Sequence, residues 1–293
     1  MTSTLIILGD SLVDSGNTAS LLSPIGQNPF ADAIYDKGGN VKASDGPVLG
    51  EHVALELGAD INDSQLISVL SADDPAAAQI HNYAHAGART GAQPGFSIPL
   101  LGSISIGLQD QVRQVKARHG FYLESDDIDV LLSCGGNDLL DVMDRAEDIQ
   151  AVVMTESLED DRALAKEMVQ PIAKNIKYSI RKLDDFVDEI AVLGAPPIVE
   201  TPEAQDWITN FASEDQAAVS NFLVMASDKL QYKLEKKYDD QMKIAVIDSD
   251  QLWQQLDQPG FVDSIHPDSN TSSALAELFG EEISATLESY AFV

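Results

Sequence analysis

Hydrophobic residues along this chain form two kinds of segment: short apolar runs, and longer stretches in which apolar positions recur every three or four residues. Short runs rich in β-branched residues are typical of buried strands, and the longer period is typical of helices that pack one face against a core. Because helical patterns separate the runs, the sequence predicts an α/β fold with a parallel sheet covered by helices. The strand-like runs are Leu5–Leu8, Ile80–Tyr83, Ile128–Leu132, Glu189–Leu193 and Lys243–Ile247.

Three stretches have the clearest helical periodicity. In the first, apolar positions from Met168 to Val187 are spaced by three or four, and Pro171 is expected in its first turn or at a kink. The second stretch runs from Val219 to Leu234, and the third from Leu275 to Leu287. Each apolar stripe is expected to face the core.

Three connecting segments exceed ordinary loop lengths, namely Ser23–Pro47, Gly91–Gly107 and Pro196–Ser213. Loops of this size often build pockets. No internal repeat, low-complexity tract or change of composition indicates a linker, so residues 1–293 are expected to form a single domain. The chain is 44% hydrophobic, which suffices for a core of that size.

The charge balance narrows the range of partners. With 48 acidic and 18 basic residues the formal net charge is -30, which disfavours binding to nucleic acid and to anionic lipid surfaces. Salt screens the resulting self-repulsion, so a salty habitat is an alternative to an ordinary acidic bacterial enzyme. No apolar run approaches the ~20 residues of a membrane-spanning helix, so stable membrane insertion is not expected. The charge leaves the oligomeric state open.

The N-terminus lacks the basic start and the long apolar stretch of a signal peptide. A cytoplasmic location is therefore the default expectation, and a secreted one applies if a signal has been removed. Cys134 is the single cysteine, which excludes an internal disulfide and a paired-thiolate zinc site. His81 and His85 have a spacing that would suit a metal, but no HExxH pattern is present, and neither metal nor cofactor is expected.

Candidate chemistry begins directly after the first predicted strand, where GDSLVDSGN places Ser11 at the carboxyl end of the sheet. Taken alone, such a serine is more often a helix cap or a turn former than a nucleophile. A nucleophilic serine needs a base, and the base needs a group that orients it. The segment DSIHPDS supplies both, because Asp263 lies three residues before His266 and can reach its Nδ1 atom, leaving Nε2 for the serine. The sequence therefore predicts a catalytic triad of Ser11, His266 and Asp263.

Donors for the negative charge of a transition state are expected in NYAHAGART and CGGNDLL, the loops after the second and third strands. Gly87 allows its backbone N–H to approach closely, and the Asn137 amide is a directed side-chain donor. The neighbouring carboxylates are expected to brace turns around the site, and His85 is expected in the pocket wall. These carboxylates are Asp10, Asp14 and Asp138.

Four blocks in this order, GDSLVDSGN, NYAHAGA, GGND and DSIHP, resemble the GDSL family of the SGNH hydrolase superfamily. The resemblance implies the same triad and an oxyanion hole made of the Ser11 N–H, the Gly87 N–H and the Asn137 side chain. It also implies a flavodoxin-like three-layer α/β/α sandwich with a five-stranded parallel sheet. The segments DGPVLGEHVALELG and APPIVETP resemble the branch that includes plant-type GDSL lipases and bacterial phospholipase-like hemolysins.

The implied function is that of a serine carboxylester hydrolase, an esterase or lipase that forms an acyl-enzyme on a small-molecule or lipid ester. Two alternatives remain at this point: a phospholipase or acyltransferase acting on lipids, and a non-catalytic sugar- or acyl-binding protein on the same fold. Apolar residues between Leu100 and Leu108 would suit a lid over lipid, or would pack beneath their own loop.

Overall fold

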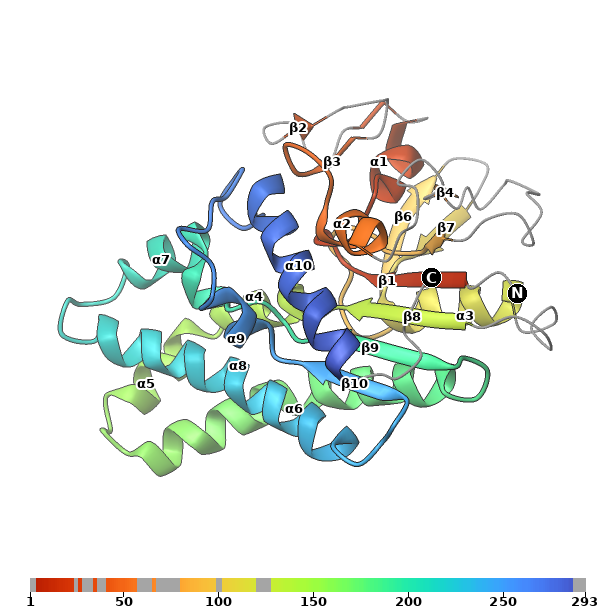
Figure 1. The fold of residues 1–293 in the computed structure, drawn as a ribbon. Coiled ribbons are helices and arrows are strands. Elements are labelled where there is room, and N and C mark those ends of the chain that lie inside the picture. The colour runs from red at the N-terminus through yellow and green to blue at the C-terminus, as the bar shows by residue number, and fades with distance from the viewer. Residues whose placement is uncertain are drawn as a thin grey trace.

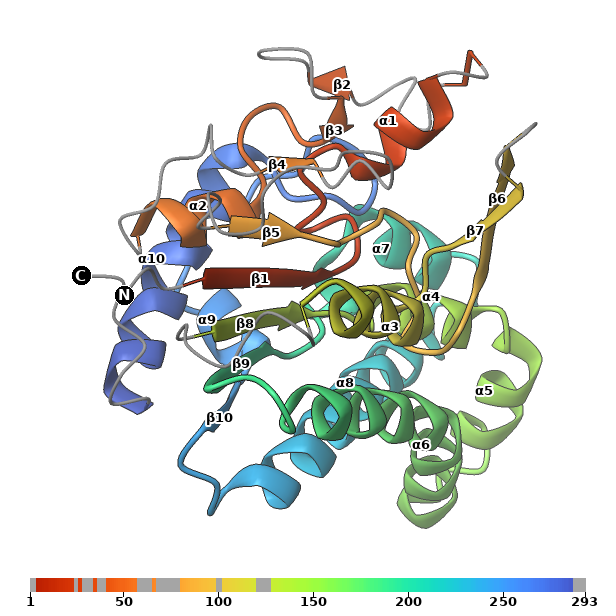
Figure 2. The same ribbon diagram turned by 90° about the vertical axis from the view of Figure 1, so that its right-hand side faces the viewer.

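A parallel sheet runs through the centre of the computed structural model, with helices on both faces (Figures 1 and 2). The structure describes residues 4–23, 26–27, 34–35, 41–56, 65–66, 80–98, 102–119 and 128–286. The strand order is β10-β9-β8-β1-β5-β4, and every neighbouring pair is parallel. The strands are β1 (Thr4–Gly9), β4 (Gln65–Leu66), β5 (Ile80–Asn82), β8 (Ile128–Ser133), β9 (Glu189–Leu193) and β10 (Ile244–Ile247).

Five of these strands coincide with the five predicted apolar runs, and β4 adds a two-residue strand at one edge. Within the five, the order β5-β1-β8-β9-β10 is the flavodoxin-like order 2-1-3-4-5. The predicted fold class is therefore confirmed. In such a sheet, ligands bind outside the carboxyl ends of the strands, near the point where the strand order reverses, which here lies between β1 and β8.

Alternate residues of the strands enter two different cores, as the period of two requires. Ile6 and Leu8 of β1 pack with the helices of one face, whereas Leu5 and Ile7 pack with those of the other. The first face is covered mainly by α3 (Leu108–His119), α6 (Leu158–Leu183) and α8 (Gln216–Tyr238), with α4 (Gly136–Met143) and α5 (Ala146–Val153) beside them. The second is covered by α2 (Leu49–Glu56), α9 (Ser249–Trp253) and α10 (Ser269–Thr286).

The helix α6 starts ten residues before the apolar stripe that predicts it. Ser157 caps it by accepting a hydrogen bond from the Asp160 N–H at 3.3 Å, and three acidic residues occupy its first turn, where the helix dipole favours negative charge. Pro171 consequently lies inside the helix, and its expected place in the first turn is wrong. Since proline has no N–H, the Glu167 carbonyl lacks its usual partner within the helix.

Two of the long connections contain structure that the sequence patterns did not predict. Gly91–Gly107 holds the antiparallel hairpin of β6 (Pro94–Ile98) and β7 (Gly102–Ser105). Pro196–Ser213 holds the 3-10 helix η3 (Ile198–Glu200) and helix α7 (Pro202–Ile208). Ser23–Pro47 is described only in part, with a pair of two-residue strands, β2 (Ile34–Tyr35) and β3 (Lys42–Ala43), after the short helix α1 (Asn17–Leu22).

The hypothesis of an apolar lid concerns residues from Leu100 to Leu108, of which Leu100 and Leu101 lie outside the described residues. Ile106 and Leu108 are buried, which fits packing beneath the loop. Across the described helices, none is both long and apolar enough to cross a membrane.

Candidate active site

Ser11 lies just beyond the carboxyl end of β1, where the backbone is held between two neighbouring elements. The Asp10 N–H donates to the Ser133 carbonyl at the end of β8. On the other side, the Gln111 amide of α3 accepts from the Gly9 N–H and donates to the Gly9 carbonyl, both at 2.8 Å. Gly9 has a φ of 154°, and a side-chain Cβ would lie 1.9 Å from the Ser133 oxygen, so only glycine fits.

A continuous chain of hydrogen bonds joins Ser11 to His266 and Asp263. The Ser11 Oγ and His266 Nε2 atoms are 2.8 Å apart, and His266 Nδ1 lies 2.6 Å from Asp263 Oδ2. Both ring nitrogens of His266 thus have a hydrogen-bond partner. Residues that are 255 positions apart in the chain meet here because β1 ends at the same edge of the sheet at which α10 begins.

The turn before α10 fixes Asp263 in place. Its Oδ1 atom accepts from the backbone N–H groups of Ile265 at 2.8 Å and His266 at 2.7 Å, while the Val262 N–H donates to the His266 carbonyl. Burial would raise the pKa of Asp263, but the hydrogen bonds from the His266 ring and the two amides outweigh it and lower that pKa to about 2. The carboxylate is therefore ionised at any pH at which an esterase would work.

The two predicted oxyanion donors lie on neighbouring segments, one a loop and the other the start of a helix. Asn137, in the first turn of α4, donates from Nδ2 to the Ala88 carbonyl at 3.1 Å, so its amide is held against the loop that contains Gly87. Gly87 has a φ of 77°, and the space beside its Cα, where a side chain would begin, is open. This left-handed backbone at residue 87 is the conformation for which glycine is suited.

A small cavity adjoins the serine. Ser11, Asn137 and His266 line it, and Gly87 is not among its lining residues. The rest of its wall comes from the serine loop, α4, the segment from Pro196 to Thr201 and the turn before α10. These residues are Asp10, Leu12, Gly136, Leu140, Pro196, Ile198, Thr201 and Ile265. Pro196, Ile198 and Thr201 belong to the long segment after β9, so this connection does form part of a pocket.

Asp14 joins the serine loop to the loop that carries Gly87. Its carboxylate accepts from the N–H groups of Gly16, Asn17, Thr18 and Ala86 at distances of 2.6 to 3.2 Å. Asp14 therefore acts through the backbone and contacts neither Ser11 nor His266 by a hydrogen bond among those found in the described residues. It helps to hold the two loops together.

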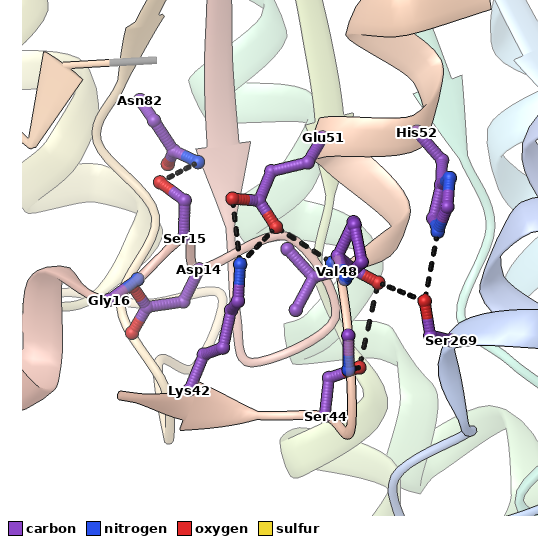
Figure 3. A network of polar contacts seen from close by, with 12 residues as sticks. Asp14, Ser15, Gly16, Lys42, Ser44, Val48, Glu51, His52, Asn82 and Ser269 are labelled. Carbon is purple, nitrogen blue, oxygen red and sulfur yellow. Dashed lines mark hydrogen bonds and ion pairs between the residues drawn. The ribbon is translucent and has the colours of Figure 1, made fainter. Parts of the chain in front are cut away.

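Asn82 makes a second link between these loops. Its Nδ2 atom donates to the Val13 carbonyl at 2.7 Å and to the Ser15 hydroxyl at 3.0 Å, and Figure 3 shows the contact to Ser15. His85, which follows in the same loop, is buried, and its Nδ1 atom has no hydrogen-bond partner among the residues that the structure describes. Burial lowers the pKa of His85, so the ring is neutral at ordinary pH. His85 does not line the cavity beside Ser11.

The other two flanking carboxylates are held differently. Asp138 accepts from both the N–H and the hydroxyl of Thr90 at 2.8 Å, which ties α4 to the Gly87 loop. Asp10 accepts from the Leu12 N–H at 3.2 Å. Burial raises the pKa of both groups, that of Asp10 to about 7. Cys134, also buried nearby, has its pKa raised by burial and remains a thiol.

A family model described as GDSL-like lipase/acylhydrolase matches residues 5–279, nearly the whole chain. This protein is a GDSL hydrolase. Membership of that family makes it a carboxylic ester hydrolase. A search of curated proteins gave no significant match.

Three solved structures of lipolytic enzymes are similar to this chain. The lipase Lip_vut3 from a goat rumen metagenome is 14% identical, with a TM-score of 0.51 and 99% coverage of both chains. The extracellular lipase of Streptomyces rimosus is 15% identical, with a TM-score of 0.45 and coverage of 98% of this chain and 100% of the lipase. Phospholipase A1 from Streptomyces albidoflavus NA297 has the same identity and coverage and a TM-score of 0.46. At this identity, the likeness to the rumen lipase supports the fold alone.

This GDSL hydrolase also has a buried ion pair that sequence reasoning missed. Lys42 Nζ lies 2.8 and 2.6 Å from the two carboxylate oxygens of Glu51, and the Val48 N–H donates to the same carboxylate at 2.8 Å (Figure 3). The Lys42 and Glu51 side chains are 6% and 2% exposed. The pair therefore fixes the turn between β3 and α2.

The turn between β3 and α2 also holds the start of α10, which lies three residues after His266. The Ser269 hydroxyl donates to the Pro47 carbonyl at 3.2 Å and lies 3.2 Å from His52 Nε2 (Figure 3). The Ser269 N–H donates to Asp45 at 2.7 Å. The segment DGPVLGEH, which we assigned only by its likeness to a branch of the family, thus anchors the helix that follows the proposed base.

The metal alternative gains no support from the part of the chain that the structure describes, where no group of three or more histidine, cysteine, aspartate or glutamate side chains is arranged to hold an ion. His81 is buried within β5.

Proposed function

We propose that this GDSL hydrolase cleaves carboxylic esters through an acyl-enzyme on Ser11, with His266 as general base and acid and Asp263 as its orienting carboxylate. The observation that carries the proposal is the unbroken hydrogen-bond chain from Ser11 Oγ through His266 to Asp263. A serine hydroxyl attacks an ester only when a positioned base removes its proton, and this arrangement supplies the base within reach.

In the first half of the reaction, His266 Nε2 takes the Ser11 proton as Oγ bonds to the ester carbonyl carbon. The tetrahedral intermediate then expels the alcohol, which receives the proton from His266, and the acyl group stays on Ser11. A water molecule repeats the sequence and releases the acid. Because the pKa of Asp263 is about 2, its negative charge is present throughout and stabilises the imidazolium formed in each half.

We assign the oxyanion hole to the backbone N–H groups of Ser11 and Gly87 and to the Asn137 amide. The Asn137 Nδ2 atom has two hydrogens, of which one is directed to the Ala88 carbonyl and the other is left for a ligand. Loss of one such donor typically raises the barrier by about 3 to 4 kcal/mol. The contact to Ala88 fixes the amide before substrate arrives, so little reorganisation is needed.

The acyl group is proposed to lie on the apolar side of the cavity, against Leu12 and Ile265. These two residues also line a second, largely apolar cavity, whose further walls include Leu49, Trp253 and Phe261. The two cavities share a wall, so an acyl chain that displaced it would enter an apolar space. Rates for p-nitrophenyl esters from acetate to palmitate would measure the chain length that this space accepts.

Three variants test the mechanism. We expect Ser11→Ala and His266→Ala to reduce kcat to near background, and Asp263→Asn to lower kcat by about 10³ to 10⁴ with KM little changed, since the amide favours the wrong imidazole tautomer. Asp257→Asn, at an exposed position six residues earlier, is the matched control and should retain wild-type kinetics. Circular dichroism checks that each variant is folded.

Turnover by pure, folded Ser11→Ala would overturn the proposal. Wild-type kcat in Asp263→Asn would remove only Asp263 and require another carboxylate to hold His266. Labelling with an organophosphonate gives an independent reading, because mass mapping should place the adduct on Ser11 and on no other serine.

A further inference from the structure

The two long helices on one face of the sheet carry most of the positive charge of this acidic protein. Helices α6 and α8 lie side by side (Figures 1 and 2). Six of the 18 basic residues lie on α6 and four on α8. From Gln170 to Leu183, α6 has four basic residues and no acidic one. In a chain of net charge -30, more than half of the basic residues thus lie on one pair of helices.

Between the helices lies a groove with a volume of about 700 Å³. Its cationic walls are formed by Lys166, Lys174, Lys177 and Arg181 on α6 and by Lys233 and Lys237 on α8. Tyr178 and Tyr238 add aromatic surface. A volume of this size falls within the usual range for small-molecule sites.

Counter-charge for these cations is nearly absent in the described residues. Among the described residues that line the groove, Asp184 is the acidic one. Its Oδ1 atom lies 3.1 Å from Nζ of Lys243, a residue that does not line the groove. None of the six cations has a carboxylate oxygen within 4 Å among the ion pairs of the described residues. Burial, followed by the like charges of Lys233 and Lys237, lowers the pKa of Lys177. The side chains repel one another, and a bound anion would relieve that repulsion.

We propose that the groove between α6 and α8 binds a small multivalent anion, a molecule with several phosphate or carboxylate groups. Cations on both walls would contact such a ligand from two sides at once. A membrane, a nucleic acid or a second copy of this chain would have to approach with a large surface against the net charge of -30, whereas a small anion meets mainly the local field of the groove.

The groove is separate from the ester site. Its lining includes Asp184, which follows α6, and Ile244, the first residue of β10, so it reaches the amino edge of the parallel sheet. Ser11 follows the carboxyl end of β1, at the opposite edge. The proposal therefore stands or falls independently of the assignment of the esterase mechanism.

Isothermal titration with inorganic tripolyphosphate, in 50 mM NaCl at pH 7.5, tests the proposal. We expect saturable one-to-one binding that weakens as salt is added. The variant Lys233→Gln/Lys237→Gln should weaken binding at least tenfold. The control Lys229→Gln/Lys236→Gln removes the same charge from the same helix outside the groove lining, and it should stay within twofold of the wild type. Both variants should hydrolyse p-nitrophenyl acetate at the wild-type rate.

Three results would overturn the proposal. The first is no saturable binding by the folded protein, and the second is equal weakening of binding in both double variants. The third is a salt-sensitive dimer of the wild type that is absent in the groove variant, together with no binding of tripolyphosphate. Equal weakening would mean that only overall charge matters. The dimer result would assign the groove to a second copy of the chain. Sedimentation velocity of all three proteins, run beside the titrations, detects that case.

Discussion

Asp10, which directly precedes Ser11, should make the folded protein less stable as the pH rises. It is 2% exposed, and among the hydrogen bonds of the described residues its carboxylate accepts one, from the Leu12 N–H. Burial raises its pKa from 3.8 to about 7. The folded protein therefore retains the Asp10 proton over a pH range in which the unfolded chain has already lost it.

The sign follows from proton linkage. A raised folded-state pKa gives stability that is complete below the unfolded pKa of 3.8 and is lost as the pH rises through about 7. At about 1.4 kcal/mol per pKa unit, the total loss is about 4 kcal/mol. About 3 kcal/mol of it falls between pH 5 and pH 8. Asp10→Asn keeps the shape and the acceptor for Leu12 but has no proton to lose.

The assay is urea unfolding of wild type and Asp10→Asn at pH 5 and pH 8. The stability of Asp10→Asn relative to wild type should increase by about 3 kcal/mol between the two pH values. Asp185→Asn, which removes an exposed carboxylate, is the control and should show little change relative to wild type. Parallel stability curves for wild type and Asp10→Asn would refute the reasoning, because Asp10 would then titrate alike in both states.

Two further predictions concern stability. Lys42→Met leaves the Glu51 carboxylate buried without its cation and should lower the free energy of unfolding by about 3 to 5 kcal/mol, whereas Lys42→Met/Glu51→Gln should recover part of this loss. Urea unfolding of both variants measures the difference. An equal or larger loss in the double variant would contradict the account. Added NaCl should raise the melting temperature, because salt screens repulsion within a chain of net charge -30, and a flat or falling melting temperature from 0.05 to 1 M would contradict this.

The sheet could be predicted from sequence because its strands are continuous apolar runs buried on both faces, as parallel strands require. The hairpin of β6 and β7 could not, since its strands are five and four residues long and contain Gly95 and Gly102, so any alternation of apolar and polar residues is too short to identify a strand. The first ten residues of α6 were also missed. They contain four acidic residues, and only two of the ten are buried or partly buried aliphatic side chains, Leu164 and Ala165, so no apolar stripe extends back to Leu158.

The candidate site also contains some residues that could be predicted from the sequence and others that could not. Asp263 and His266 are three residues apart, and Ser11 ends an apolar run, so local patterns point to all three. Gln111 contacts Gly9 across 102 positions, and Ser269 contacts His52 across 217. Such contacts leave no local pattern in one sequence, because a glutamine on a helix or a serine at a helix start has many ordinary explanations.

The polar contacts missed from sequence explain how irregular segments can hold a site steady. A buried ion pair such as Lys42–Glu51 contributes little net stability, because desolvation of the two charges offsets most of their attraction. Its effect here is geometric, because it fixes the turn whose Pro47 carbonyl accepts a hydrogen bond from Ser269. Ser269 begins the helix directly after the turn of Asp263 and His266.

On the other side of the site, Asp14 fixes the loop of Gly87 to the loop of Ser11. Proposed nucleophile, base and oxyanion donor are thus each held by buried groups that need not touch the substrate, which is how a preorganised site lowers the cost of reaching its transition state.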